Sequence, residues 1–363
     1  MLLYSVIIIG LVYLSIGRIG NIKEDTELKV LMVFLWLMAS LRAVTIGNDT
    51  QTYYNLFQRV CSVDNIFSLS GRYEVGYLIL NRLVGYLTTN FTILLAVVNA
   101  IIYFAYYQFI KRYSANKVFS VFLFFTLGMW GQTMNIIRLQ LAIAMMIYAF
   151  ISRDDKKNIR AVLFALLAFS FHRLAIVFWV GLLIPKMIRK EYYILLTVAT
   201  LVALVILPQL MALAAHFVPY FGTYLSSSSY VIGEVKLASL VGVLMRFAVL
   251  VVGLYIYRNN CGLFSIEEKE NISLQINMVF ISFLCMLVSL RFNLFDRCSY
   301  FFWVFALSLI PNAINYLRLK NNRLFFIIGV AVVCFAYFVI VNIYRPNWNH
   351  IFPYVTIFSI ESY

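Results

Sequence analysis

The sequence predicts an all-α, polytopic integral membrane protein. Hydrophobic residues make up 63% of the chain, charged residues only 12%, and the mean hydropathy is +0.88. No soluble fold has enough interior to bury that much apolar surface. Apolar runs suited to transmembrane helices of ~20 residues recur at short intervals, with charged breaks between them. With a short broken hairpin described below, we expect about twelve transmembrane helices.

The clearest apolar runs follow one another along the whole chain, at residues 2–16, 30–41, 91–110, 118–130, 136–151, 192–207, 237–257, 273–290, 298–316 and 324–343. The first run has no basic segment before it and no small-residue cleavage site after it, so we expect a retained span rather than a signal peptide. The longest polar gap, from 42 to about 75, is too short for a soluble core. We therefore expect a single transmembrane domain over residues 1–363.

The broken hairpin lies between Lys156 and Lys190, a segment with basic residues at both ends. The positive-inside rule places both ends in the cytoplasm, so the segment must go out and come back. Each arm then has about 13 residues, or ~20 Å, which is short of a full crossing. The turn falls at Phe171, His172 and Arg173. A polar turn at that depth is tolerated only where it lines a watered cavity enclosed by protein.

Arginine and lysine divide unequally between the two sides of this predicted topology. With the N-terminus outside, the inner loops hold ten lysines and eight arginines, whereas ten of the eleven basic residues in the outer half are arginine. Topology does not distinguish the two residue types, but phosphate favours the planar, bidentate guanidinium. For Arg59, Arg82 and Arg345 we favour snorkelling to lipid headgroups. Arg138 and Arg246 lie inside apolar runs, where a charge is costly and indicates function.

Two outer loops carry further signals. Residues 42–90 are expected to form an outer loop with interfacial helices, because Asp49 can cap a helix that begins near Thr50 and residues 72–87 have amphipathic spacing. Tyr53 and Phe57 then share one helical face. Residues 208–236, with four consecutive serines at 226–229, form a candidate lid.

The sequence lacks the motifs that are typical of several classes of chemistry. The five cysteines have no paired spacing, and there is no Walker A loop and no glycine fingerprint for a dinucleotide. We expect no metal, no cofactor and no nucleic-acid partner.

Six short motifs, taken together, resemble one family. They are Arg42 with Gly47-Asn48-Asp49-Thr50 and Tyr53, then Arg72-Tyr-Glu74-Val-Gly76-Tyr77, Arg138, Phe171-His172-Arg173, Arg297-Cys-Ser-Tyr300-Phe301 and Phe352-Pro353-Tyr354. Their order and spacing resemble the EpsG-type, Wzy-like exopolysaccharide and O-antigen polymerases over almost the whole chain. Each motif alone is weak, and their order carries the resemblance.

The resemblance implies a glycosyltransferase, with a GT-C-like fold as one candidate, at the outer face of the bacterial cytoplasmic membrane. Such an enzyme moves a growing glycan from polyprenyl diphosphate onto a new lipid-linked repeat unit. The implied partners are polyprenyl-diphosphate-linked oligosaccharides, membrane lipids and, as a further candidate, a chain-length regulator. A diphosphate leaving group needs cations, for which we predict arginines instead of a divalent metal. The predicted substrate-binding residues are Arg42, Tyr53, Arg72, Arg138, Arg173, Arg246, Arg291, Arg297 and Tyr300.

Three residues compete as the base that deprotonates the attacking sugar hydroxyl. His172 has a suitable ordinary pKa, with a structural or substrate-binding role as its alternative. Asp49 is the second candidate, with helix capping as its alternative. Glu74 is the third, and pairing with the neighbouring Arg72 is the interpretation we favour for it.

Two other functions stay open at this point. A flippase for lipid-linked oligosaccharides would also need an arginine-lined cavity, but with arginines along its full depth, whereas these gather toward one face. An O-antigen ligase or another lipid-linked glycosyltransferase would share both the arginines and the base.

Overall fold

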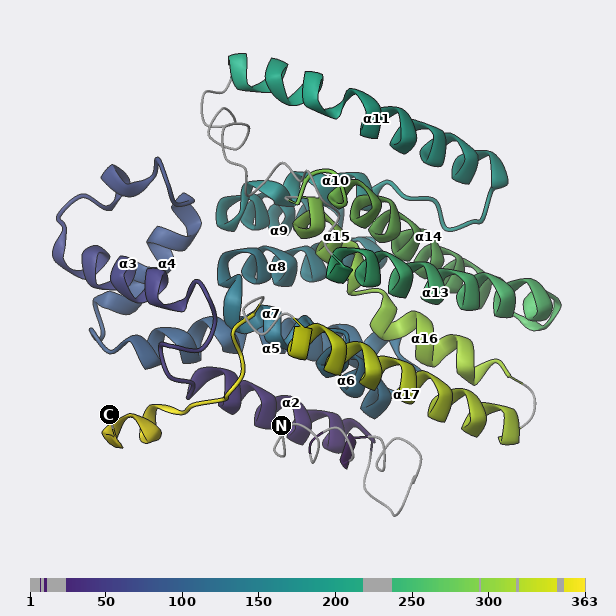
Figure 1. Cartoon of the computed structure of the whole chain (residues 1–363), viewed down its shortest axis with the longest axis horizontal. Coiled ribbons are helices and arrows are strands. Elements are labelled where there is room, and N and C mark those ends of the chain that lie inside the picture. The colour runs from purple at the N-terminus through teal and green to yellow at the C-terminus, as the bar shows by residue number, and fades with distance from the viewer. Residues whose placement is uncertain are drawn as a thin grey trace. The chain divides into compact units, whose positions relative to one another are not determined.

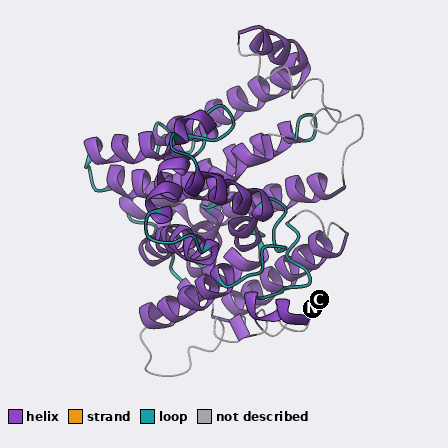
Figure 2. Ribbon diagram, turned by 90° about the vertical axis from the view of Figure 1, so that its left-hand side faces the viewer, coloured by secondary structure: helices purple, strands orange, loops and turns teal. Residues whose placement is uncertain are grey.

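The computed structural model describes residues 24–217, 237–293, 295–317, 320–344 and 349–362, together with residues 7, 10 and 11. Within these ranges every regular element is a helix, and β pairing is limited to one isolated bridge between Arg42 and Thr356 (Figure 2). The predicted all-α class is confirmed. The predicted first span, 2–16, lies almost wholly outside the described residues.

The chain divides into two compact units, which we call unit 1 and unit 2. Unit 1 comprises Met1–Leu182 and Leu317–Tyr363, and unit 2 comprises Leu183–Tyr316. The single domain over 1–363 stays a prediction.

Unit 1 contains most of the described helices. In chain order they are α2 (Glu24–Ser40), α3 (Thr50–Ser62), η1 (Ile66–Leu69), α4 (Val75–Gly85), α5 (Phe91–Tyr113), α6 (Lys117–Thr126), α7 (Met129–Asn135), α8 (Ile137–Asp154), α9 (Asn158–Phe171), η2 (Arg173–Ala175), α10 (Ile176–Leu182), α17 (Lys320–Tyr344) and η4 (Ile357–Ser362). Helices α2, α5 and α6 pack against one another (Figure 1).

Unit 2 is built from longer helices, namely α11 (Lys190–Phe217), α13 (Leu237–Asn260), η3 (Cys261–Leu263), α14 (Ile266–Ser289), α15 (Phe295–Trp303) and α16 (Ala306–Asn315). Helices α13, α14 and α16 pack together (Figure 1). A capping box in which Ser265 and Glu268 exchange hydrogen bonds begins α14.

Four described helices are long and apolar enough to cross a membrane, at Phe91–Tyr113, Ser239–Leu263, Ile266–Ser289 and Arg323–Asn342. The pair α15 and α16, bent by 41°, makes a fifth if it is one span. Each predicted apolar run after the first lies on described helices, but several of these are short, such as α6 and α9. The count of about twelve spans is therefore not confirmed.

Helix α6 forms the centre of unit 1. All its residues from Val118 to Thr126 are buried, as is the whole of α7. A helix that is apolar on every face needs protein or lipid all round, and here protein surrounds it. The two helices are separated at Gly128, whose φ of 84° lies in the left-handed region that glycine tolerates.

Helices α9 and α10 meet at His172, where the sequence predicts the turn of the broken hairpin. Both are short and apolar. The lid prediction is only partly addressed, because residues 208–217 continue α11 as helix and the rest of 208–236 lies outside the described residues.

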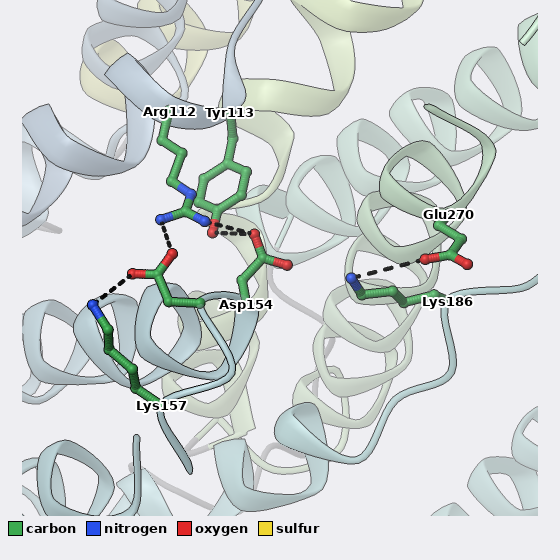
Figure 3. Close-up of polar contacts among 7 residues, drawn as sticks. Arg112, Tyr113, Asp154, Lys157, Lys186 and Glu270 are labelled. Carbon is green, nitrogen blue, oxygen red and sulfur yellow. Dashed lines mark hydrogen bonds and ion pairs between the residues drawn. The ribbon is translucent and has the colours of Figure 1, made fainter. Parts of the chain in front are cut away.

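Ion pairs join the end of α5 to the loop between α8 and α9. Arg112 contacts Asp154 at 3.1 Å and Asp155 at 2.6 Å, and the hydroxyl of Tyr113 donates to Asp154 at 3.2 Å (Figure 3). Lys157 lies 3.9 Å from Asp155. In unit 2, Lys186 lies 4.0 Å from Glu270 (Figure 3). The contacts in unit 1 balance two cations with two carboxylates and join α5 to the end of α8.

Candidate functional site

Arg42, the first arginine of the matched motifs, is fully buried in unit 1. Its guanidinium donates to the carbonyl of Ala39, at the end of α2, and to that of Met134, near the end of α7, at 3.1 Å. Burial lowers the pKa of Arg42 to about 10, which still leaves it protonated at neutral pH. A cation that neutralises two helix C-termini has a structural role, so the geometry does not favour its predicted contact with substrate.

The Asp49 loop, residues 47–50, packs tightly against the end of α7. Gly47 has φ of 88°, and a Cβ on it would lie 2.4 Å from the Met134 carbonyl oxygen. The Thr50 hydroxyl donates to that oxygen at 3.1 Å, and the Asp49 amide donates to Asn135 at 3.3 Å. Asp49 occupies the predicted N-cap of α3, but its side chain makes no capping hydrogen bond. The half-buried carboxylate of Asp49 therefore does not cap α3.

The last described segment completes this loop. The Gly47 amide donates to the His350 carbonyl at 3.0 Å, and the Ala43 amide donates to that of Val355 at 2.9 Å. The hydroxyl of Tyr354 donates to the Met38 carbonyl. The first and last motifs of the sequence, 300 residues apart, thus meet in space.

Arg138 lies at the centre of a second group, which we call the arginine cluster: Tyr53, Arg72, Tyr73, Glu74, Arg138 and Arg173. Its guanidinium forms an ion pair with Glu74 and lies 5.2 Å from the ring centroid of Tyr73 and 6.0 Å from that of Tyr53. The guanidinium of Arg72 lies 5.6 Å from the same Tyr73 centroid. Glu74 therefore pairs with Arg138, and not with Arg72 as the sequence predicts.

The turn at His172 completes the arginine cluster. The Arg173 amide donates to Glu74 at 3.5 Å, and the Arg173 side chain is exposed. The Leu174 amide donates to His172 Nδ1 at 3.2 Å. When Nδ1 accepts in this way, Nε2 carries the hydrogen of the neutral ring, so the imidazole presents a donor and not a base. The geometry thus favours a structural or binding role for His172.

A close helix contact fixes the two sides of the arginine cluster. A Cβ on Gly76 would lie 2.3 Å from Ser170 Oγ and 2.8 Å from the Ser170 carbonyl oxygen. The backbones of α4 and α9 are therefore in direct contact. Helix α4 follows Glu74, and α9 precedes His172. Only glycine permits this approach.

Arg246 in unit 2 has a different environment. It is 2% exposed, and its Nε donates to the hydroxyls of Ser282 at 3.1 Å and Ser299 at 2.8 Å. Its Nη1 donates to the Gly242 carbonyl at 3.0 Å, and the guanidinium lies 4.6 Å from the Trp303 ring centroid. These contacts join α13 to α14 and α15.

The other predicted residues of unit 2 lie near the start of α15. The Tyr300 hydroxyl donates to Asp296 at 3.3 Å, and Tyr300 is buried. Arg297 is half-buried and Arg291 is exposed, just after α14. Their predicted contact with diphosphate stays a prediction.

Two residues of the unit 1 site were missed by the sequence reasoning, Tyr73 and Asn135. Tyr73 stands between Arg72 and Glu74 within a matched motif, which was an available signal. Asn135 gave none, because its contact with the Asp49 amide joins residues 86 positions apart. Within the described ranges, no three His, Cys, Asp or Glu side chains form a group able to hold a metal ion.

Comparison with known protein families gives a match that covers most of the chain. Residues 28–356 match the EpsG family. No curated protein and no solved structure matches the chain. The resemblance predicted from the motifs is confirmed, and the chain belongs to the EpsG family of polysaccharide polymerase-like membrane proteins.

Proposed function

We propose that the protein polymerises glycan repeat units at the outer face of the bacterial cytoplasmic membrane. In this proposal the growing glycan moves from polyprenyl diphosphate onto a lipid-linked repeat unit. One observation supports it above the others: the guanidinium groups of Arg72 and Arg138 both lie against the Tyr73 ring, and Glu74 contacts Arg138 and the backbone amide of Arg173. The chain that holds them matches the EpsG family over residues 28–356.

The proposed reaction is a displacement at the anomeric carbon. The hydroxyl oxygen of the acceptor sugar bonds to the anomeric carbon of the growing glycan, and the bond from that carbon to the diphosphate oxygen breaks. The electron pair leaves with polyprenyl diphosphate, and the hydroxyl proton passes to a base on the protein.

The arginine cluster has the charge that this leaving group needs. Arg72 and Arg138 place two cations against Tyr73, and only Arg138 is paired with the carboxylate of Glu74. Arg173 adds an exposed side chain on the adjoining turn, so we expect the site to attract a diphosphate. Arg138 Nε is buried and makes no hydrogen bond among the described residues, which leaves a donor for a ligand. The rings of Tyr53 and Tyr73 can contact sugar faces, although Tyr53 is 4% exposed and must shift to do so.

Two carboxylates remain as proton acceptors, Asp49 and Glu74. Glu74 is held by Arg138, and it becomes available when a diphosphate takes over the guanidinium. Asp49 lies at the N-terminus of α3 and has no capping bond to break. Comparing Asp49→Asn with Glu74→Gln in single-turnover assays separates the two, because loss of the base slows the chemical step itself.

The decisive experiment supplies the purified protein, in liposomes, with polyprenyl-diphosphate-linked repeat units. We expect a ladder of longer glycans on a gel, and the same ladder after EDTA treatment. Movement of intact substrate across the bilayer without a ladder would instead indicate a flippase. A single transfer to a different lipid acceptor would indicate a ligase-type enzyme.

A further inference from the structure

Unit 1 contains an open groove that is separate from the arginine cluster. It has a volume of about 900 Å³ and lies among α2, α5, α8 and α9. Its walls are apolar and aromatic, and include Trp36, Phe104, Tyr107 and Phe164. A volume of this size falls within the range of about 300–1,000 Å³ that is usual for small-ligand sites.

Two cations also line this groove, Lys29 from α2 and Arg160 from α9. Among the described residues neither forms an ion pair with a carboxylate. The Arg160 guanidinium instead lies 5.5 Å from the Phe164 ring centroid, and Phe164 stacks on Tyr148 at 5.2 Å. The cation of Arg160 thus contacts the aromatic side chains that line the groove.

A smaller cavity of about 460 Å³ shares Phe104, Tyr148 and Arg160 with the groove. It adds Lys111 and Arg112, and also Asp155. That carboxylate is already held by Arg112 at 2.6 Å. The hydrogen bond from Arg112 lowers the pKa of Asp155 and the charge of Arg160 adds a smaller effect, but no ion pair joins Arg160 to Asp155 among the described residues. Arg160 and Lys29 can therefore contact a ligand.

The groove lies in the cytoplasmic half of unit 1 if the positive-inside rule holds. Lys29 lies in the second turn of α2, Arg160 in the first turn of α9 and Lys111 in the last turn of α5. These helix ends adjoin the loops with Lys117, Lys156 and Lys157. Tyr148 is ten residues beyond Arg138 on α8, or about 15 Å along the helix. The groove is therefore distinct from the arginine cluster.

We propose that this groove binds an anionic phospholipid of the cytoplasmic leaflet, with an acyl chain against Trp36 and Phe104 and its phosphate between Lys29 and Arg160. Apolar walls alone attract any lipid, but two cations without carboxylate partners select for a negative headgroup. Each basic residue near a membrane surface strengthens the binding of an anionic lipid by about fivefold.

Tryptophan quenching tests this proposal, because Trp36 lines the groove. The protein is placed in phosphatidylcholine bilayers with a small fraction of either brominated phosphatidylglycerol or brominated phosphatidylcholine. We expect stronger quenching by the brominated phosphatidylglycerol, and we expect Trp36→Phe to abolish the excess. Equal quenching by both lipids would overturn the proposal.

Charge variants locate the headgroup. The double variant K29Q/R160Q should weaken the apparent affinity for brominated phosphatidylglycerol by about fivefold per cation. The matched double variant K156Q/K157Q removes two exposed cations that do not line the groove, and it should retain the excess quenching. If K29Q/R160Q keeps the excess, or if both double variants lose it equally, the attraction is a general surface effect and the site is refuted.

Two further measurements keep the outcome clear. Ala100→Phe fills the groove without changing charge, so it should also remove the excess quenching even if the charge variant fails to fold. Unlabelled phosphatidylglycerol should displace the brominated lipid at least as well as unlabelled polyprenyl phosphate. Stronger displacement by polyprenyl phosphate would identify the carrier lipid as the occupant and contradict the proposal.

Discussion

Arg138 and Arg246 look alike in the sequence, where each is an arginine inside an apolar run, but their surroundings differ. The Arg138 side chain is 21% exposed, pairs with a carboxylate and lies near two tyrosine rings. Arg246 is 2% exposed and donates to two serine hydroxyls and a carbonyl. Hydroxyl and carbonyl acceptors within the packed helices hold Arg246 in place, whereas partial exposure leaves Arg138 able to exchange partners.

Arg42 supports the same distinction. Like Arg246 it is buried and donates to carbonyl oxygens, although it stands in the most recognisable motif of the chain. An intramembrane arginine therefore indicates function only after its partners are known. We propose that this difference separates ligand-binding from structural arginines, and the following changes test it.

Arg138→Ala should have the largest effect. Removing a charged donor that stabilises a leaving group typically slows a reaction by about 100-fold or more, so we expect the glycan ladder to disappear under conditions where the unmodified protein completes it. Arg138→Lys should restore only part of the rate, because lysine lacks the bidentate fork. The control is Arg59→Ala, an exposed arginine of α3 outside the cluster. A normal ladder from Arg138→Ala would refute the diphosphate site.

Arg246→Ala should instead reduce stability. The change leaves a cavity beside Trp303 and removes three hydrogen bonds, so we expect a loss of about 3 kcal/mol in the free energy of unfolding. Thermal unfolding in detergent measures it. Ladder formation per folded molecule should stay near that of the unmodified protein. A stable but inactive Arg246→Ala would show that burial among hydroxyl and carbonyl acceptors does not mark a structural arginine.

His172 variants should have a smaller effect. Asparagine can accept the hydrogen bond from the Leu174 amide, so His172→Asn should retain most of the activity. His172→Ala loses that bond and should destabilise the turn by about 1 kcal/mol, with a modest fall in ladder formation. If both variants were equally inactive at unchanged stability, the imidazole itself would take part in the reaction.

Acidification should have the smallest effect. The hydrogen bond from Arg112 lowers the pKa of Asp155 below its ordinary value. A lowered pKa in the folded state contributes stability that is present above the unfolded-state pKa of about 3.9 and is lost as the pH falls below it. Between pH 5 and 3, Arg112→Gln should therefore show a smaller fall in thermal midpoint than the unmodified protein. Parallel curves for the two proteins would show that this pair does not contribute.

The sequence predicted helices well, because apolar runs depend on local composition. The all-helical class, the helix that begins at Thr50 and the break at His172 were all predicted. The lengths of the membrane spans were harder to predict. A short helix such as α6 can be wholly buried in protein, and its length then does not have to match the thickness of the bilayer.

Partners of the site residues were the weakest predictions. Glu74 was expected to pair with the adjacent Arg72, but its partner is Arg138, 64 positions away. Sequence spacing gives local pairs on one helix, whereas this ion pair depends on how α4 packs against α9 and α9 against α8. Arg42 was likewise predicted to bind substrate, because the sequence does not show that its side chain lies between the ends of two helices.

The pairing of residues 41–47 with residues 350–357 has a consequence for the order in which the protein is made. Asp49 leaves the ribosome long before the carbonyl of His350 and the amide of Ile357, which hold the loop in place. A chain that stops after Tyr344 would still contain every long helix described here, yet its Asp49 loop would lack its support. This site can therefore assemble only after residues 350–357 have been synthesised.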